Sequence, residues 1–326
     1  MVNLNDVKEI VEGIYKERNK VNSVYYVGCG ASQAELYPAN YFLNENEKTL
    51  RSGLVQANEF VHATPAAVGR DSIVVACSLG GNTPETVAAA KKAAQLGAKV
   101  IALTHDADSP LAGEADEVIV HGFEASYSAK CEKMIYALAI ANEVLHQSEK
   151  YSGYEKMLDA MKNIPMLVDE SVKHVVPEAV KFAQAYKDVP VVYVMSSGAA
   201  RGVAYTFSNC LLMEMQWINS GNFHDGDFFH GPFEIVDKGV PFLLLMNDGR
   251  TRTLDSRALA FLQRFDALAT VIDAKDFGLA SVADAEVIDY LNPVLLTAVV
   301  RVYAEQLALF RDHPLTKRRY MWKLSY

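Results

Sequence analysis

The sequence predicts an α/β protein made of two similar units, each a doubly wound parallel sheet flanked by helices. Short apolar segments rich in β-branched residues alternate with helical patterns, which is typical of parallel strands that are covered on both faces. This alternation runs through the first part of the chain, stops in a polar helical stretch and then begins again. The 326 residues are enough for about two domains. The repetition therefore indicates an internal duplication of one α/β unit.

The first unit is expected to cover residues 1–150. An acidic amphipathic helix at the N-terminus precedes a short apolar strand, and a second strand leads into another helix, followed by two further strands and a long helix. In chain order the expected strands are 24–27, 73–77, 99–104 and 117–120, and the expected helices are 1–17, 84–96 and 125–147.

A helical connector is expected over residues 151–180, where the sequence has no strand signal, and the second unit is expected over residues 181–326. The pattern of the first unit then returns, with a helix after the first strand. The expected strands of this unit are 191–195, 241–246, 269–272 and 286–288, and the helices are 202–218 and 251–265.

Two glycine-rich turns in the first unit have the chemistry of a phosphate site. Ser78 to Thr83 joins a strand to a helix that begins with proline, and such a helix start presents free backbone N–H groups and a positive dipole end. Gly30 and Ser32 follow the preceding strand in the same way. Because the carboxyl ends of parallel strands meet at one edge of the sheet, the two turns should converge there. An ordinary capped turn, with Asn82 or Thr83 as the cap, is the alternative interpretation.

The phosphate turns do not resemble nucleotide sites, since the Walker lysine and the GxGxxG spacing are both missing. In the second unit, NDGRTRT stands where the first has SLGGNT, so the phosphate site is assigned to the first unit. Ser128 and Lys130, at the start of the long helix, either face this site or cap and solvate the helix.

Glu214 is a candidate general base, because it falls on the apolar stripe of the predicted helix 202–218. A carboxylate on such a face is desolvated, which raises its pKa, unless it is a structural glutamate paired with a base. His230 follows 16 residues later within HGPFE, between aromatic residues and a Gly-Pro turn, and a core histidine is the first interpretation there. With His224, Asp225 and Asp227 it could also be viewed as a metal-ligand set, but the spacing matches no standard one, so no metal is expected.

Composition limits the function further. The formal net charge of −9 argues against a nucleic-acid partner, which would call for a basic stripe. The four cysteines, Cys29, Cys77, Cys131 and Cys210, have no CxxC spacing and indicate neither zinc nor a disulfide framework. With no basic leader and no apolar run of membrane length, a soluble, cytoplasmic protein is expected.

Taken together, the duplicated unit, the Ser/Thr turn and the glutamate followed by HGPFE resemble the sugar isomerase (SIS) domain family. The resemblance covers nearly the whole chain, and the layout is similar to the isomerase half of glucosamine-6-phosphate synthase. The segments MEMQWINS and GDFFHGPFEI resemble the Amadori-product deglycases, those acting on 6-phosphofructose-aspartate more than those acting on fructoselysine 6-phosphate. This resemblance implies two tandem SIS domains in a homodimer, with the active site near the subunit interface and no metal or organic cofactor.

By the same resemblance, Glu214 would be the base and His230 the acid, the latter supplied by the neighbouring subunit in some members. Seven residues would hold the sugar phosphate: Gly30, Ser32, Ser78, Gly80, Thr83, Ser128 and Lys323. Leu79 and Gly80 stand where the synthase has Gln and Ser, so backbone N–H groups would replace those contacts. Arg201, Lys317, Arg318 and Arg319 could meet a substrate carboxylate, although a run such as KRR is usually solvated.

Two features of the related proteins are missing from the sequence. The sequence has no glutaminase domain, and Val2 stands where such a domain would have its cysteine, so ammonia production from glutamine is not expected. The lack of a helix-turn-helix segment argues against a transcription regulator. The sequence leaves open a phosphosugar isomerase, which needs the same base and phosphate cradle, and a non-catalytic sugar-phosphate sensor, which has no use for Glu214.

Overall fold

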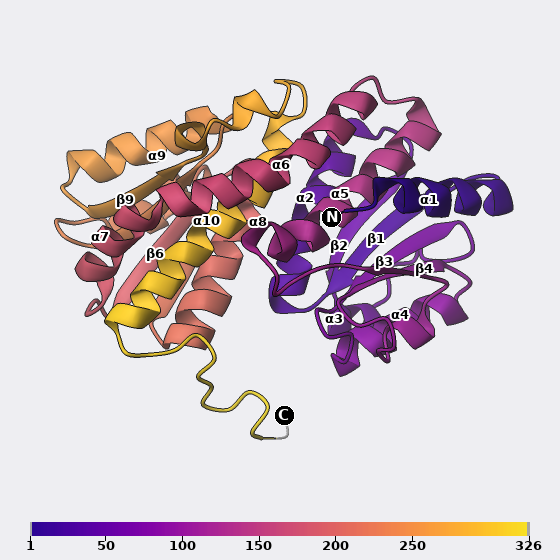
Figure 1. Ribbon diagram of the computed structural model, residues 1–326, viewed down its shortest axis with the longest axis horizontal. Helices are drawn as coiled ribbons and strands as arrows, with labels where there is room; N and C mark the ends of the chain where they lie inside the picture. The colour runs from indigo at the N-terminus through magenta and orange to yellow at the C-terminus, as the bar shows by residue number, and fades with distance from the viewer. Residues whose placement is uncertain (1, 325–326) are drawn as a thin grey trace.

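In the computed structural model, which describes residues 2–324, two parallel sheets lie side by side with helices between and around them (Figure 1). The first sheet has the order β2-β1-β3-β4-β5, with β1 (Ser23–Gly28), β2 (Arg51–Gln56), β3 (Ser72–Cys77), β4 (Lys99–Thr104) and β5 (Glu117–Val120). The second has the order β7-β6-β8-β9, with β6 (Val191–Ser196), β7 (Asn219–His224), β8 (Pro241–Met246) and β9 (Leu268–Asp273). The predicted α/β class with parallel sheets is confirmed.

The strand order of the first sheet reverses between β1 and β3. The chain moves outward from β1 to β2 and then returns to the other side of β1 to form β3, in parallel register with Gly28 opposite Cys77. At such a reversal the two connections leave on opposite faces, and ligands bind outside the carboxyl ends of the strands. The second sheet repeats the reversal between β6 and β8.

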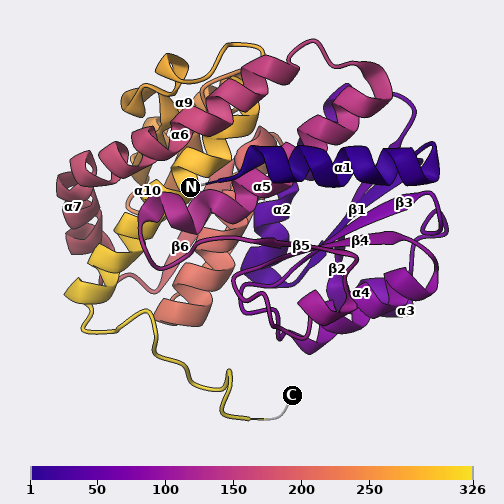
Figure 2. The same cartoon turned by 45° about the vertical axis from the view of Figure 1, so that its right-hand side comes forward.

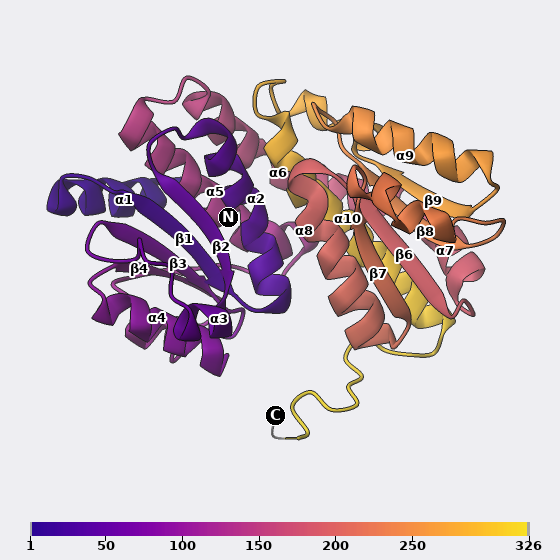
Figure 3. The same ribbon diagram turned by 180° about the vertical axis from the view of Figure 1, so that it is seen from behind.

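Helices cover both faces of each sheet. In the first half, α3 and α4 lie on one face, and α1, α2 and α5 lie on the other (Figures 1 and 2). Figure 3 shows α2 of the first half next to α8 of the second, and the two helices are in contact. The first-half helices are α1 (Leu4–Arg18), α2 (Gly30–Asn46), α3 (Ala57–His62), α4 (Pro84–Gln95) and α5 (Tyr127–Glu149). The remaining helices are α6 (Tyr154–His174), α7 (Val176–Tyr186), α8 (Arg201–Tyr205), α9 (Arg252–Arg264) and α10 (Ile288–Phe310).

One hydrophobic core joins the two halves. It contains Val24 of β1, Leu138 of α5 and Leu295 of α10, all inaccessible to solvent. The helix α10 is long and apolar enough to cross a membrane, which was not anticipated from the sequence, but 67% of its apolar window is buried inside the protein. Such burial is what a core helix requires.

Three local predictions are wrong. Residues 286–288 form no strand; the Asp284 side chain accepts a hydrogen bond from the Glu286 N–H at 2.9 Å, and α10 begins at Ile288. That local bond favours a turn over an extended chain. The strands β2 and β7 were not anticipated, because both are edge strands with polar and glycine residues and lack an apolar run. The helix expected over 202–218 is instead short α8 followed by a π-helix, Thr206–Gln216.

Gly202 permits the close contact between the halves, and alanine at this position is expected to destabilise the protein. A Cβ atom there would lie 2.4 Å from the Ala34 carbonyl oxygen on α2, and backbone cannot move aside as a side chain can. The expected loss in the free energy of unfolding for Gly202→Ala is about 1–3 kcal/mol, the usual cost of overpacking. Urea denaturation measures it.

Gly13→Ala is the matched control, because it makes the same chemical change in α1 where nothing lies within 4 Å. Alanine is the better helix former by about 0.8–1 kcal/mol, so this variant should be slightly more stable than wild type. Equal stability of the two variants would contradict the proposed tight contact.

Candidate active site

The two predicted phosphate turns lie at the carboxyl ends of β1 and β3, at the reversal point of the first sheet. Gly30 has φ +54° and Gly81 has φ +64°, a conformation that favours glycine. A Cβ atom on Gly81 would also lie 2.1 Å from Ser109 Oγ. Both turns are therefore held in shapes that a larger residue would disrupt, and Gly80, next to Gly81, sits within the second of them.

Hydroxyl groups and free N–H groups meet at the second turn. Ser78 Oγ and Thr83 Oγ1 are 2.8 Å apart. Thr83 occupies the N-cap position of α4, as expected, but its side chain makes no capping hydrogen bond to the described helix. Pro84 has no N–H and the Thr86 N–H donates to the Thr83 carbonyl at 3.0 Å, so the Glu85 N–H at the start of α4 is left for another acceptor. A phosphate oxygen is well suited to this position.

Ser128 is engaged elsewhere. Its Oγ donates to Asp169 Oδ2 of α6 at 2.7 Å, and its N–H donates to Asp169 Oδ1 at 3.1 Å. Among the described residues it lines neither of the two cavities that surround the π-helix. The interpretation as a residue at the helix start, where Ser126 is the N-cap, fits this structure better than a place in the sugar site.

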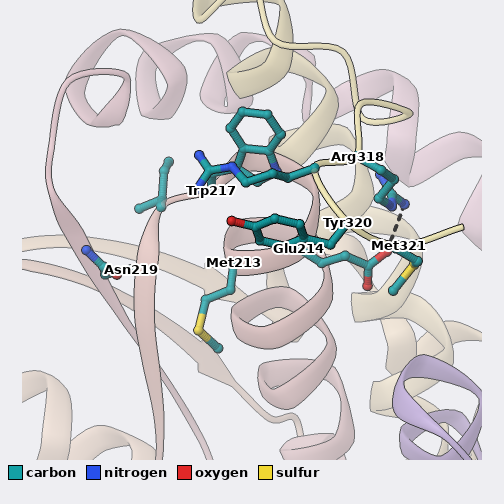
Figure 4. A pocket seen from close by; sticks show the side chains of 9 residues that line it. Met213, Glu214, Trp217, Asn219, Arg318, Tyr320 and Met321 are labelled. Atoms are coloured by element: carbon teal, nitrogen blue, oxygen red, sulfur yellow. Dashed lines mark ion pairs between the residues drawn. The ribbon is translucent and has the colours of Figure 1, made fainter. Parts of the chain in front are cut away.

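Glu214 lies on the π-helix and faces a cavity of about 530 Å³ (Figure 4). The π-helix hydrogen bonds span five residues, so the spacing that predicted a stripe on an α-helix is altered, and such helices are frequent at functional sites. Phe207, Cys210 and Leu211 are buried as predicted, whereas the Glu214 side chain keeps 24% of its surface exposed. Desolvation raises the pKa of Glu214, and Arg318 partly offsets that rise.

The C-terminal segment closes this cavity. Arg318 Nη2 lies 2.8 Å from Glu214 Oε1, and the Arg318 side chain is only 8% exposed. The expectation that the KRR run is solvated is therefore wrong for Arg318. Arg319 lies over the ring of Trp217, which ends the π-helix, at 4.3 Å. Lys323 Nζ donates to the Arg318 carbonyl oxygen at 2.7 Å, and Lys323 is not among the described residues that line the cavity.

A second cavity, of about 170 Å³, lies between the halves and connects the first turn with the other side of the π-helix. Ser32 and Leu79 line it from the first half, and Cys210 lines it from the π-helix. A buried ion pair between Lys133 and Glu35 also borders this cavity. This pair was not anticipated from the sequence, because its two charges lie on helices that are far apart in the chain and that each carry other charged residues.

His230 is exposed at the end of a short 3₁₀ turn, Asp227–His230. It is not among the described residues that line the cavity around Glu214. Arg201, another predicted substrate contact, lines a separate pocket of about 250 Å³ with Tyr37 and Asn222. Within one chain, the structure therefore brings together Glu214 and Arg318 but leaves His230 outside.

The corresponding edge of the second sheet is occupied by the protein's own carboxylate. Asp255 accepts hydrogen bonds from the Asn247 N–H at 2.7 Å and from the Ser197 hydroxyl. Burial, with Asp255 beside it, raises the pKa of Asp225 to about 10. A carboxyl group of the protein itself thus sits where the first half offers N–H and hydroxyl groups.

Comparisons with known proteins agree on one family. The SIS domain model matches residues 19–127. The fructosamine deglycase FrlB of Bacillus subtilis (strain 168) is 40% identical over 308 residues, covering 94% of this chain and 93% of that protein. A fructoselysine 6-phosphate deglycase of Escherichia coli O157:H7 is 26% identical, covering 96% and 89%.

Solved structures show the same fold. A Salmonella typhimurium LT2 structure, provisionally described as a phosphosugar isomerase, has a TM-score of 0.95 and 40% identity over 99% of both chains. The C-terminal domain of glucosamine-fructose-6-phosphate aminotransferase from Francisella tularensis has a TM-score of 0.77 at 19% identity, covering 95% of this chain and 94% of that one.

Proposed function

Since the chain belongs to the SIS family, in its group of Amadori-product deglycases, we propose that it hydrolyses a 6-phosphorylated fructosamine to glucose 6-phosphate and a free amino acid. The observation that carries the proposal is Glu214, a half-buried carboxylate with a raised pKa that faces a cavity closed by the C-terminal segment. A sensor has no need for such a group.

The architecture belongs to the proposal as well. We propose that residues 1–150 and 181–326 are tandem SIS domains joined by a helical connector. The support is the shared strand order and the left-handed glycines Gly30 and Gly198, both with φ +54° directly after the first strand of each sheet. We also propose that the protein forms a homodimer in the cytoplasm.

The phosphate is placed on the first-half turns, with Ser32, Ser78 and Thr83 donating to its oxygens together with the Glu85 N–H at the start of α4. His230, from the partner subunit, assists opening of the sugar ring and protonates the C2 oxygen. Glu214 removes a proton from C1, which gives an enaminol. Protonation at C2 then leaves an imine at C1, and water hydrolyses the imine. The adjacent carbonyl acidifies the C1–H bond, so the chain's own acid and base suffice for these steps.

The preferred amine is aspartate. The cavity around Glu214 carries two guanidinium groups, Arg318 and Arg319, and both lie in the tail segment that closes it. A second carboxylate on the substrate is attracted by these groups, whereas the side-chain ammonium of a lysine is repelled. Fructoselysine 6-phosphate is the alternative substrate within the same group.

Release of glucose 6-phosphate tests the proposal. The purified protein is given 6-phosphofructose-aspartate and, separately, fructoselysine 6-phosphate, with fructose 6-phosphate as the control for simple isomerisation. Fast release from the aspartate compound alone is expected. Release from neither compound, together with conversion of fructose 6-phosphate, would replace the proposal by a phosphosugar isomerase.

Arg318 should set the pH dependence of the reaction. Glu214 must be deprotonated to act as a base, so activity is lost as the pH falls through its pKa. Desolvation raises the pKa of Glu214 and Arg318 lowers it, so Arg318→Met should raise it further. The acid limb of the profile of kcat/KM against pH is then expected to move to higher pH.

Arg264→Met, an exposed arginine at the end of α9, is the matched control and should leave the acid limb in place. An acid limb that stays in place in Arg318→Met as well would show that another group limits the rate at low pH.

A further inference from the structure

The strongest unexplained feature is the buried ion pair between Lys133 of α5 and Glu35 of α2. Lys133 Nζ lies 2.5 Å from Glu35 Oε2, and the side chains are 5% and 14% exposed. Burial works to lower the pKa of Lys133, but Glu35 outweighs it, and the net shift is upward, so the side chain is an ammonium. The mechanism above uses neither residue.

Stability does not account for the pair. Two charges taken out of water lose hydration that their mutual attraction seldom exceeds, and apolar residues of similar volume are often at least as stable. Both residues line the cavity between the halves. A functional explanation therefore has to be sought in what the ammonium faces.

The ammonium faces the first phosphate turn. Lys133 Nζ donates to Ser32 Oγ at 3.4 Å, and Leu79 of the second turn lines the same cavity. A serine hydroxyl has one proton and two acceptor positions. When Lys133 occupies an acceptor position, the Ser32 proton is directed to another acceptor. The neighbouring Cys77 thiol is only a weak acceptor of this proton, so a phosphate oxygen can replace it.

We propose that the Lys133–Glu35 pair is a positioning device of the sugar-phosphate site, in which Lys133 supplies a buried positive charge and orients the Ser32 hydroxyl toward a phosphate oxygen. Glu35 holds the ammonium in place. This inference rests on the proposed sugar-phosphate substrate but not on the chemistry at Glu214. The residues of the first turn are all uncharged, so the positive charge that assists phosphate binding there comes from Lys133.

The double variant E35M/K133M tests the role without an unpaired buried charge. Removal of both charges at similar volume should leave the free energy of unfolding equal or higher. The dissociation constant for glucose 6-phosphate, measured by calorimetry, should nevertheless rise by roughly 10- to 100-fold, the value of a hydrogen bond to a charged group. In turnover, KM should rise by a similar factor while kcat changes little.

Lys130→Met is the matched control. Lys130 lines the same cavity, but its Nζ donates to the Phe123 carbonyl at 3.1 Å and makes no described contact with Ser32. The dissociation constant of the Lys130→Met variant for glucose 6-phosphate should stay within about threefold of wild type, because a screened charge that does not contact Ser32 contributes little to binding.

Unchanged binding of glucose 6-phosphate by E35M/K133M would overturn the inference and leave the pair as a structural link. An equal loss of affinity for glucose 6-phosphate in Lys130→Met would also overturn it, because the loss would then come from the total charge of the cavity and not from the contact with Ser32. Wild-type protein that binds glucose 6-phosphate but releases none from either fructosamine would contradict only the proposed function. Wild-type protein that binds no sugar phosphate would contradict both.

Discussion

Glu214→Gln is expected to reduce turnover of the 6-phosphorylated fructosamine by about 100- to 10,000-fold, the contribution of a general base. Glutamine keeps the shape of the side chain and can still accept a hydrogen bond from Arg318, which lies 2.8 Å away in the native protein. It cannot accept the C1 proton. Folding and the binding of glucose 6-phosphate should therefore stay close to wild type while kcat falls by this factor.

The measurement is kcat from coupled detection of glucose 6-phosphate, with thermal unfolding and glucose 6-phosphate binding as companion readouts. Glu155→Gln is the matched control, because this glutamate is exposed in the first turn of α6. Near-normal kcat in Glu214→Gln would remove Glu214 from the mechanism and, with it, the main reason to prefer an enzyme over a sensor.

His230→Ala is expected to cause a loss of similar size, again about 100- to 10,000-fold, if the histidine is the acid. The structure makes this prediction sharper than the sequence does. His230 is exposed and does not line the described cavity around Glu214 in its own chain. An exposed side chain can reach the site of a second copy in a symmetric dimer, where each chain completes the other's site.

Mixing the two inactive variants separates the possibilities. A mixed dimer has one site with Glu214 from the His230→Ala chain and His230 from the Glu214→Gln chain, so this site is intact. Random exchange after co-refolding places half of the chains in mixed dimers, and about a quarter of wild-type activity should return. A mixture that stays inactive although the chains exchange would mean that His230 acts within its own chain or not at all.

The sequence predicted most of the fold because its signals are local. Strands such as β3 and β8 are continuous apolar runs, and turns such as Ser78–Gly81 depend on glycine and hydroxyl residues that are close in the chain. Local signals also explain the errors. The edge strands β2 and β7 carry no apolar run, and the turn before α10 is held by hydrogen bonds to the side chain and the carbonyl of Asp284.

For the candidate site too, only the parts that depend on local signals were predicted from the sequence. The phosphate turns and Glu214 came from patterns within one strand, turn or helix. The Lys133–Ser32 contact spans 101 residues, and that between Ser128 and Asp169 spans 41. The ion pair of Arg318 with Glu214 joins the C-terminal segment to the π-helix.

By itself, the sequence determined the alternating α/β units and the glycine-rich turns, and it predicted a candidate base, because each depends on neighbours in the chain. Only the tertiary structure decided which charges meet: Arg318 with Glu214, Lys133 with Glu35, and Asp255 with the turn that would otherwise accept an anion. The physical reason is that a charge is desolvated, paired or left free by the elements that pack against it. That packing is fixed by the buried surfaces of the whole chain, which no single segment contains.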